Sequence, residues 1–189
     1  MTETPNPNIV DTDTLTGEMH PVRRCVLSIG SNLGERFNNL QGAVNALADT
    51  PEVWVTAVSP VYETEPVDSP EGSKYYLNAV VLADTTLSAR TLLDRALAIE
   101  DAYGRERSGE HNEPRTLDVD LIVVGDRRAN DDDLVLPHPR AHERAFVLAP
   151  WRDLEPDADL LDHGPVAELL EKAADQAVIL RDDLSLTYQ

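Results

Sequence analysis

Apolar positions along the chain change their spacing several times, and each change marks a predicted element. Residues 25–29 form a short apolar run that Gly30 closes, a pattern typical of a buried strand. In residues 37–47 the apolar side chains recur every three or four positions, as they do in an amphipathic helix. Valine and aromatic residues dominate residues 53–62, which predicts a second strand.

The same kind of evidence continues through the middle of the chain. Residues 63–74 contain two prolines and a glycine, so they predict a long surface loop. Residues 76–83 predict a third strand, and residues 87–103 carry leucine and alanine at helical spacing up to a terminating glycine. A charged loop at 105–114 then leads into a fourth predicted strand at 117–124.

The order strand, helix, strand, strand, helix, strand predicts an α+β fold, a ferredoxin-like βαββαβ sandwich with its helices on one face of the sheet. Helices predicted at 141–149 and 165–177, with extra C-terminal strands, extend this core. Residues 1–22 are polar and acidic without a period, so they predict a disordered tail. We therefore expect a single domain over residues 23–189.

Composition narrows the classes of function. The chain of 189 residues has 35 acidic and 16 basic residues, a formal net charge of −19, which argues against nucleic-acid binding because that binding needs a basic field. No apolar run is long enough to span a membrane, and the first residues lack the features of a secretory signal. Cys25 is the only cysteine, so the chain can form no internal disulfide that a reducing compartment would break. We expect a cytoplasmic protein.

The densest chemical signal is the pair Asp118 and Asp120. On a strand these side chains project from one face about 7 Å apart, and two carboxylates so placed can hold hard cations. Aspartates two residues apart occur four times in this chain, so the spacing alone is weak evidence. This pair alone lies inside an apolar strand, where charge is costly unless a cation offsets it, and an arginine stands three residues ahead of it. A metal site and a solvated acidic pair both remain open.

Two other patterns are ambiguous or negative. Residues 30–34 form a glycine-bounded turn between a strand and a helix, where backbone amides could meet an anion. A capped glycine-rich turn explains the same residues equally well, and no lysine follows the second glycine as in a Walker A loop. His138 and His142 have the spacing of a metal pair, but prolines on both sides of His138 exclude it from a helix interior, so we reject a zinc site.

Several motifs occur together and in order across residues 24–160. They are Gly-Ser-Asn-Leu at 30–33, Tyr-Leu-Asn at 76–78, Pro-Arg-Thr-Leu-Asp-Val-Asp at 114–120 and Pro-His at 137–138. In this set the sequence resembles the 6-hydroxymethyl-7,8-dihydropterin pyrophosphokinase family of folate biosynthesis. The resemblance implies transfer of the β,γ-diphosphate of ATP to the pterin hydroxymethyl group, with release of AMP. It also implies two Mg²⁺ ions, small-molecule partners and a monomer.

The resemblance assigns roles to individual positions. Metal ligands would be Asp118 and Asp120. From its location alone, we hypothesise that Asp120 also acts in catalysis by taking the hydroxyl proton. Catalysis would further use three arginines, Arg105, Arg107 and Arg115. ATP would be bound by Glu100, Arg107, Arg115, His138 and Arg144. The pterin would lie between the rings of Tyr76 and Phe146, because offset stacking suits a flat heterocycle. It would contact Thr64, Val67 and Asn78, and the Asn78 amide can both donate a hydrogen bond to the pterin edge and accept one from it.

The sequence departs from the family's usual residues at Asn112-Glu113, at Pro139 and in the acidic turn 131–133. None of these departures touches the metal pair. Two alternatives stay open: another metal-dependent nucleotide transferase, which would release ADP or diphosphate, and a non-catalytic ferredoxin-like binding module, since a fold does not fix a function.

Overall fold

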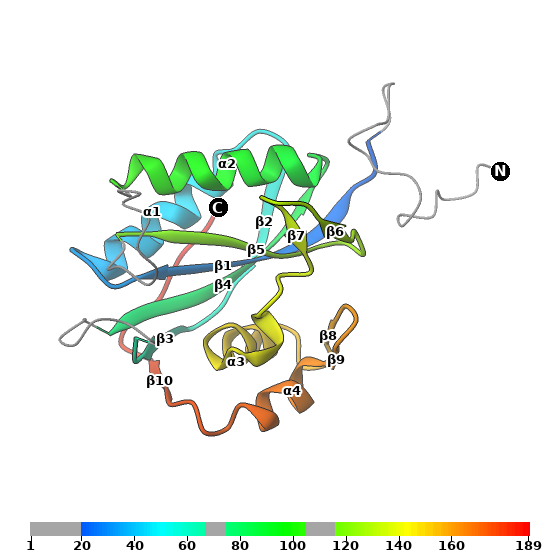
Figure 1. Ribbon diagram of the computed structural model, residues 1–189. Coiled ribbons are helices and arrows are strands. Elements are labelled where there is room, and N and C mark those ends of the chain that lie inside the picture. The colour runs from blue at the N-terminus through cyan, green and yellow to red at the C-terminus, as the bar shows by residue number, and fades with distance from the viewer. Residues whose placement is uncertain (1–19, 67–74, 105–115) are drawn as a thin grey trace.

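The computed structural model describes residues 20–66, 75–104 and 116–189, built on one six-stranded sheet (Figure 1). Its strands are β1 (Arg23–Ser31), β2 (Val53–Val58), β3 (Val61–Thr64), β4 (Tyr76–Thr85), β5 (Asp118–Val124) and β10 (Val178–Arg181). The helices are α1 (Arg36–Ala48), α2 (Ala89–Ala102), the short 3-10 helix η2 (Ala141–Glu143), α3 (Ala145–Leu154) and α4 (Val166–Lys172). Two small hairpins are β6 (Ala129–Asn130) with β7 (Val135–Leu136), and β8 (Asp159–Leu160) with β9 (Gly164–Pro165).

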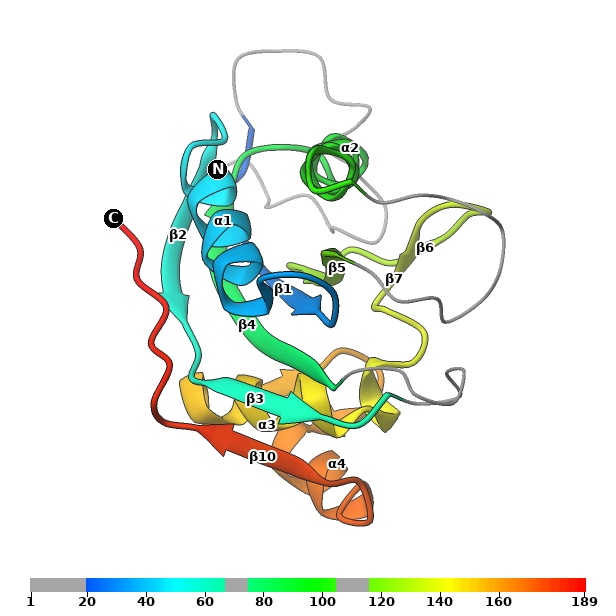
Figure 2. The ribbon, with the colours of Figure 1, turned by 90° about the vertical axis from the view of Figure 1, so that its left-hand side faces the viewer.

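The sheet has the strand order β10-β3-β4-β1-β5, with β2 also paired to β4, and the pairings are antiparallel. With β2 and β3 counted together as the one strand predicted at 53–62, the elements from β1 to β5 follow the predicted βαββαβ order, so the ferredoxin-like fold is confirmed. Figure 2 shows β2 and β3 lying one after the other along the same side of β4. Strand β5 forms one edge of the sheet and β10 the other.

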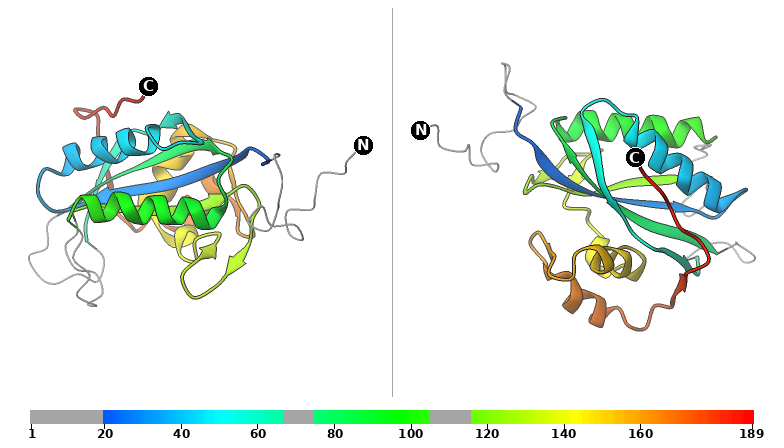
Figure 3. Two further views of the ribbon diagram at one scale, coloured as in Figure 1. Left: turned by 90° about the horizontal axis from the view of Figure 1, so that it is seen from above. Right: turned by 180° about the vertical axis from the view of Figure 1, so that it is seen from behind.

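Both faces of the sheet are covered by helices (Figure 3). Alternate residues of β1, namely Cys25, Leu27 and Ile29, pack in the core that contains α1 and α2, whereas Val26 packs in a second core with α3 and α4. This follows from the two-residue side-chain period of a strand. The two helices of the predicted ferredoxin-like core, α1 and α2, therefore lie on one face as expected, and the additional helix α3 buries its apolar side against β4 and β3 on the other face.

The single strand predicted at 53–62 is divided in two. Ser59 and Pro60 interrupt it, and proline lacks the N–H that a continuous strand would use in the ladder. Ser59 compensates at the break: its N–H donates to the carbonyl of Val80 at 2.9 Å, and its hydroxyl accepts from the Val80 N–H at 2.8 Å. After the break the chain continues antiparallel to β4, so that β2 pairs with one end of β4 and β3 with the other end.

The C-terminal part of the chain completes the sheet and then crosses it. The predicted helix at 141–149 is interrupted at Arg144, whose extended backbone separates η2 from α3. Strand β10 then pairs with β3, and the last residues run over α1 and β2. There Gln41 exchanges hydrogen bonds with Thr187, and the Tyr188 hydroxyl donates to the carbonyl of Thr56 at 2.7 Å.

No helix in the described ranges is both long and apolar enough to cross a membrane. The predicted disordered tail falls almost entirely on residues 1–19, which lie outside the described part of the chain.

The hydrogen bond between the Tyr62 hydroxyl and Asp153 fastens α3 to β3. Burial, with this bond adding to it, raises the pKa of Tyr62 to about 12. We expect Tyr62→Phe to lower the free energy of unfolding by about 1 kcal/mol in urea titrations, because a buried bond is lost. Tyr188→Phe, which loses a bond on the exposed terminal segment, is the control and should cost about half as much or less. Equal losses in the two variants would contradict this role for Tyr62.

Candidate active site

Strand β5 presents two different faces. Val119 and Leu121 pack in the core with α1 and α2, and the half-buried Asp118 and Asp120 project from the opposite face, toward the side covered by α3. In the ladder Asp118 lies opposite Gly30 of β1. Asp120 lies opposite Ser28 in the next row of that face. The predicted alternation is thus present, with both carboxylates on one surface of the sheet.

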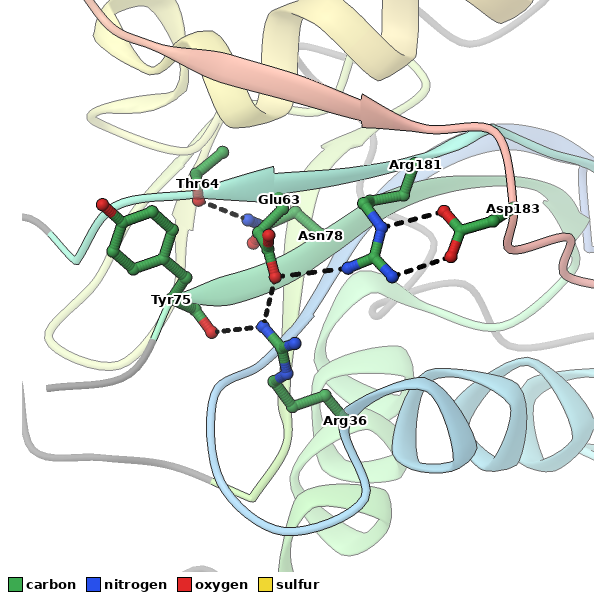
Figure 4. Close-up of polar contacts among 7 residues, drawn as sticks. All are labelled: Arg36, Glu63, Thr64, Tyr75, Asn78, Arg181 and Asp183. Carbon is green, nitrogen blue, oxygen red and sulfur yellow. Dashed lines mark hydrogen bonds and ion pairs between the residues drawn. The ribbon is translucent and has the colours of Figure 1, made fainter.

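A row of cross-strand neighbours continues from Asp118 across the sheet. Gly30 is paired with Asn78 of β4, and Asn78 is paired with Tyr62 of β3. The Asn78 amide is buried and donates from Nδ2 to the Thr64 hydroxyl at 2.7 Å (Figure 4). A Cβ on residue 30 would lie 2.8 Å from Asn78 Oδ1, so only glycine leaves room for the amide there. The ring of Tyr76 borders the same space.

Arg144 and Phe146, at the start of α3, cover this face. The Arg144 guanidinium lies over the Phe146 ring at 5.5 Å, within the range of a cation–π contact. Burial lowers the pKa of Arg144, and the nearby carboxylates of Asp120 and Asp118 oppose that effect. An arginine that interacts with both aspartates reduces their mutual repulsion.

His138 is fixed by its own backbone and by the following turn. Its N–H donates to the carbonyl of Ile122 at 2.8 Å, and its ring Nδ1 accepts from the N–H of Arg140 at 3.2 Å. Burial, together with the positive charges of Arg144 and Arg140, lowers the pKa of His138 to about 4. The ring is therefore neutral near pH 7, and because Nδ1 accepts, the proton is on Nε2, which can donate to a ligand.

Glu100 supports the carboxylate strand from the side. Its side chain is buried, and Oε2 accepts a 2.9 Å hydrogen bond from the N–H of Val119, between the two aspartates. Because β5 is an edge strand, this bond satisfies a backbone donor that no further strand would meet. Glu100 also borders a cavity of about 250 Å³ beside β5, whose other lining residues include Leu93, Leu97, Asp120, Leu134, Val135 and His138.

The turn at residues 30–34 is held by protein groups. Gly30 and Ser31 belong to β1, and the Asn39 amide of α1 donates to the Ser31 hydroxyl and to the carbonyls of Leu33 and Thr116. The turn is thus stabilised by the Asn39 side chain, but the predicted serine or asparagine cap is wrong, because the N-cap residue of α1 is Glu35 and makes no side-chain capping hydrogen bond. The acidic turn is also engaged: Asp131 and Asp133 both accept hydrogen bonds from Arg90 of α2.

The predicted site residues therefore fall into two neighbouring groups on one side of the molecule. The first group consists of Asp118 and Asp120 with Arg144, His138 and Glu100. The second group, beside it, consists of Thr64, Tyr76, Asn78 and Phe146. The remaining predicted residues, Val67, Arg105, Arg107 and Arg115, lie outside the described residues.

Two features of the site were not identified from the sequence. Gly30 was interpreted only as part of a turn, although a glycine inside a strand can signal the close approach of another group. The apolar cavity walls, such as Leu93 and Leu97, have the same spacing as ordinary core residues of a helix, so nothing in the sequence distinguishes them.

Among the described residues, no three histidine, cysteine, aspartate or glutamate side chains converge as a ready-made metal site. The two carboxylates can supply part of a coordination shell. Mg²⁺ is commonly held in this way, by one or two carboxylates together with water and substrate phosphates.

Known proteins resemble this chain in both sequence and fold. The sequence model of the 7,8-dihydro-6-hydroxymethylpterin-pyrophosphokinase family matches residues 26–156. The 2-amino-4-hydroxy-6-hydroxymethyldihydropteridine pyrophosphokinase of Mycobacterium tuberculosis is 42% identical over 160 residues, covering 78% of this chain and 82% of the relative. The protein of the same name from Pseudomonas aeruginosa is 38% identical, covering 79% of this chain and 91% of the relative.

Among solved structures, the wild-type Plasmodium falciparum HPPK-DHPS with pterin and p-hydroxybenzoate matches with a TM-score of 0.63 and 15% identity. The match covers 82% of this chain and 44% of that one, so this chain spans less than half of that protein. At this identity the likeness supports the fold alone.

The depressed pKa of His138 predicts a loss of stability in acid. In the unfolded state His138 takes up a proton at its usual pKa of about 6.5, whereas in the folded state it does so only near 4. The contribution of neutral His138 to the free energy of unfolding is therefore fully present above about pH 6.5 and falls as the pH drops toward 4. We expect the His138 contribution to the unfolding free energy to fall by about 2 kcal/mol between about pH 7 and pH 5. Urea titrations of the wild type and His138→Gln measure it, and parallel pH dependences in the two proteins would contradict it.

Proposed function

The chain belongs to the 7,8-dihydro-6-hydroxymethylpterin-pyrophosphokinase family, and from that premise we propose that the sheet face bearing Asp118 and Asp120 is its active site. The enzyme transfers the β,γ-diphosphate of ATP to the hydroxymethyl group of 6-hydroxymethyl-7,8-dihydropterin in folate biosynthesis and releases AMP. The observation that carries the site is the ladder register, since it aligns Asp118 with Gly30 and Asn78 in one row beneath α3.

We propose that Asp118 and Asp120 hold two Mg²⁺ ions together with the phosphates of ATP. The donor set suits this metal, because both groups are hard carboxylate oxygens on one half-buried surface, with room in the coordination shell for phosphate and water. Bound there, the ions would neutralise the charge that develops on the phosphates during transfer. Arg144, which already interacts with both aspartates, would add positive charge on the same side.

The nucleotide is proposed to extend from this pair into the cavity beside β5. Its leucine and valine walls suit the faces of a purine, and its volume of about 250 Å³ accommodates one. His138 borders the cavity with a neutral ring and a proton on Nε2, so it can donate a hydrogen bond to the nucleoside. Glu100 would then act at the cavity wall with its second carboxylate oxygen, while Arg107 and Arg115 would contact the phosphates.

The pterin is proposed to lie between Tyr76 and Phe146, with Asn78 and Thr64 at its edge and Val67 nearby. The hydrogen bond from Asn78 to Thr64 fixes the amide, so that Oδ1 faces Gly30 as an acceptor and one hydrogen of Nδ2 is left as a donor. A pterin edge presents donors and acceptors side by side, which such an amide can match. The Thr64 hydroxyl accepts from Asn78 and can donate its own hydrogen.

With both substrates so placed, positioning and electrostatics supply most of the catalysis. Asp120 is proposed to take the proton of the attacking hydroxyl, and Arg105, Arg107 and Arg115 to stabilise the phosphates. We propose that the enzyme works as a monomer and acts in the cytoplasm.

Replacement of the paired carboxylates tests the metal proposal. We expect Asp118→Asn and Asp120→Asn each to lower the rate of AMP formation by roughly 100-fold or more and to weaken Mn²⁺ binding in the presence of an ATP analogue. Asp157→Asn and Asp159→Asn are matched controls, because that pair has the same spacing at an exposed position, and they should behave like the wild type. Release of ADP or free diphosphate instead of AMP would favour another nucleotide transferase.

A change of Asn78 tests the pterin site. Asn78→Ala removes the amide that is proposed to read the pterin edge and leaves the Thr64 hydroxyl without its donor, so we expect the KM for the pterin to rise roughly 10-fold or more. The KM for ATP should change by less than about twofold, since the amide lies in the pterin group of residues. An unchanged pterin KM would place the pterin elsewhere.

A further inference from the structure

The short pairing between β3 and β4 ends where the proposed pterin residues lie. Only three rows join the two strands: Tyr62 opposite Asn78, Glu63 opposite Leu77, and Thr64 opposite Tyr76. Two of these rows contain residues of the pterin group. The rest of the sheet supports this end least, because the ladder between β1 and β4 begins at Leu77 and does not include Tyr76. Fraying there would move the Tyr76 ring away from Thr64 and Asn78.

One side chain from outside the pair holds both strands at that end. Nη1 of Arg36, at the start of α1, donates to Glu63 Oε2 at 2.7 Å and to the carbonyl oxygen of Tyr75 at 2.9 Å (Figure 4). Glu63 immediately precedes Thr64 along the chain. The Tyr75 carbonyl belongs to the planar peptide group that includes the nitrogen of Tyr76, so fixing this oxygen restricts the orientation of that peptide.

The second partner of Glu63 cannot replace this bridge. Arg181 of β10 also approaches Glu63 Oε2, at 3.3 Å, while its guanidinium is engaged in two hydrogen bonds with Asp183 (Figure 4). Arg181 therefore keeps Glu63 paired on the β10 side, but within the described part of the chain the hydrogen bonds of its guanidinium reach only Glu63 and Asp183, and not β4. The Tyr75 hydroxyl also donates to Glu65 Oε1 at 2.8 Å on the exposed surface, so Arg36 is not alone in joining the two segments. Arg36 is nevertheless the side chain that joins Glu63 of β3 to the Tyr75 peptide carbonyl.

We propose that Arg36 is a positioning residue for pterin binding: by bridging Glu63 and the Tyr75 carbonyl, it keeps Thr64, Tyr76 and Asn78 aligned. Arg36 lies on the α1 side of the sheet, because Glu63 projects from the face opposite to Thr64. It therefore acts through the strands and does not contact the substrate. This inference rests on the proposed pterin pocket.

The energetic consequence should appear in pterin binding and hardly at all in stability. Arg36 and Glu63 are both partly exposed, with side-chain exposures of 27% and 21%, and ion pairs of this kind contribute little to global folding. The fraction of time for which the strand end is ordered can change without a change in the free energy of global unfolding. A pocket that is ordered only part of the time binds its ligand more weakly in proportion to the ordered fraction.

The test is a comparison of steady-state constants for Arg36→Met and the wild type. We expect the pterin KM to rise roughly five- to tenfold, with the ATP KM within about twofold and the melting temperature lowered by no more than a few degrees. Arg36→Lys should restore the pterin KM to within about twofold of the wild type, because a single nitrogen makes both contacts and an ammonium has three donors.

Arg128→Met is the matched control. It removes two hydrogen bonds between Arg128 and Asp162, away from the proposed pocket, and should leave both KM values unchanged. A pterin KM in Arg36→Met within twofold of the wild type would overturn the inference. So would equal increases in both KM values, or failure of Arg36→Lys to restore binding.

The Asn78→Ala result distinguishes failure of the proposed pterin pocket from failure of the proposed role of Arg36. If Asn78→Ala raises the pterin KM and Arg36→Met does not, the pocket stands and only the positioning role is lost. If neither variant changes the pterin KM, the proposed pocket itself is wrong, and the role of Arg36 falls with it.

Discussion

The structure depends on the ability of one edge strand to serve two environments. Strand β5 buries Val119 and Leu121 against the helices and exposes two like charges on its other face, where their repulsion must be offset. Arg144 supplies part of that offset from the start of α3. An edge strand also has backbone N–H groups that need acceptors from outside the sheet, and Glu100 accepts the hydrogen bond of the Val119 N–H. The face that bears the two aspartates is thus stabilised by residues on both sides of the strand.

Local patterns in the sequence were sufficient to predict the central fold. The apolar spacing around β1, α1, β4, α2 and β5 reflects a two-residue or 3.6-residue period that each element has by itself, and the observed bounds agree within a few residues. The alternation in residues 117–121 also predicted that Asp118 and Asp120 share a face. Their grouping with Asn78 and Arg144 was implied only by the resemblance to a family, because it depends on strands far apart in the chain.

The features that the sequence did not predict arise from long-range contacts. Nothing local to α3 indicates which face of the sheet it covers, and the pairing of β10 with β3 joins residues more than 100 positions apart. The role of Gly30 appears only once Asn78 lies opposite, and the bridge made by Arg36 requires α1, β3 and β4 to be in place. The positions of Val67, Arg105, Arg107 and Arg115 remain predictions.

The path of the chain after β10 has a practical consequence. Thr187 is bound to Gln41 of α1 and Tyr188 to Thr56 of β2, so Gln189 lies on the side of the sheet opposite to Asp118 and Asp120. A reporter protein, an affinity tag or a surface linker attached there would begin on the face opposite to the two aspartates. Immobilisation through the C-terminus should therefore leave the sheet face that bears Asp118 and Asp120 turned away from the support.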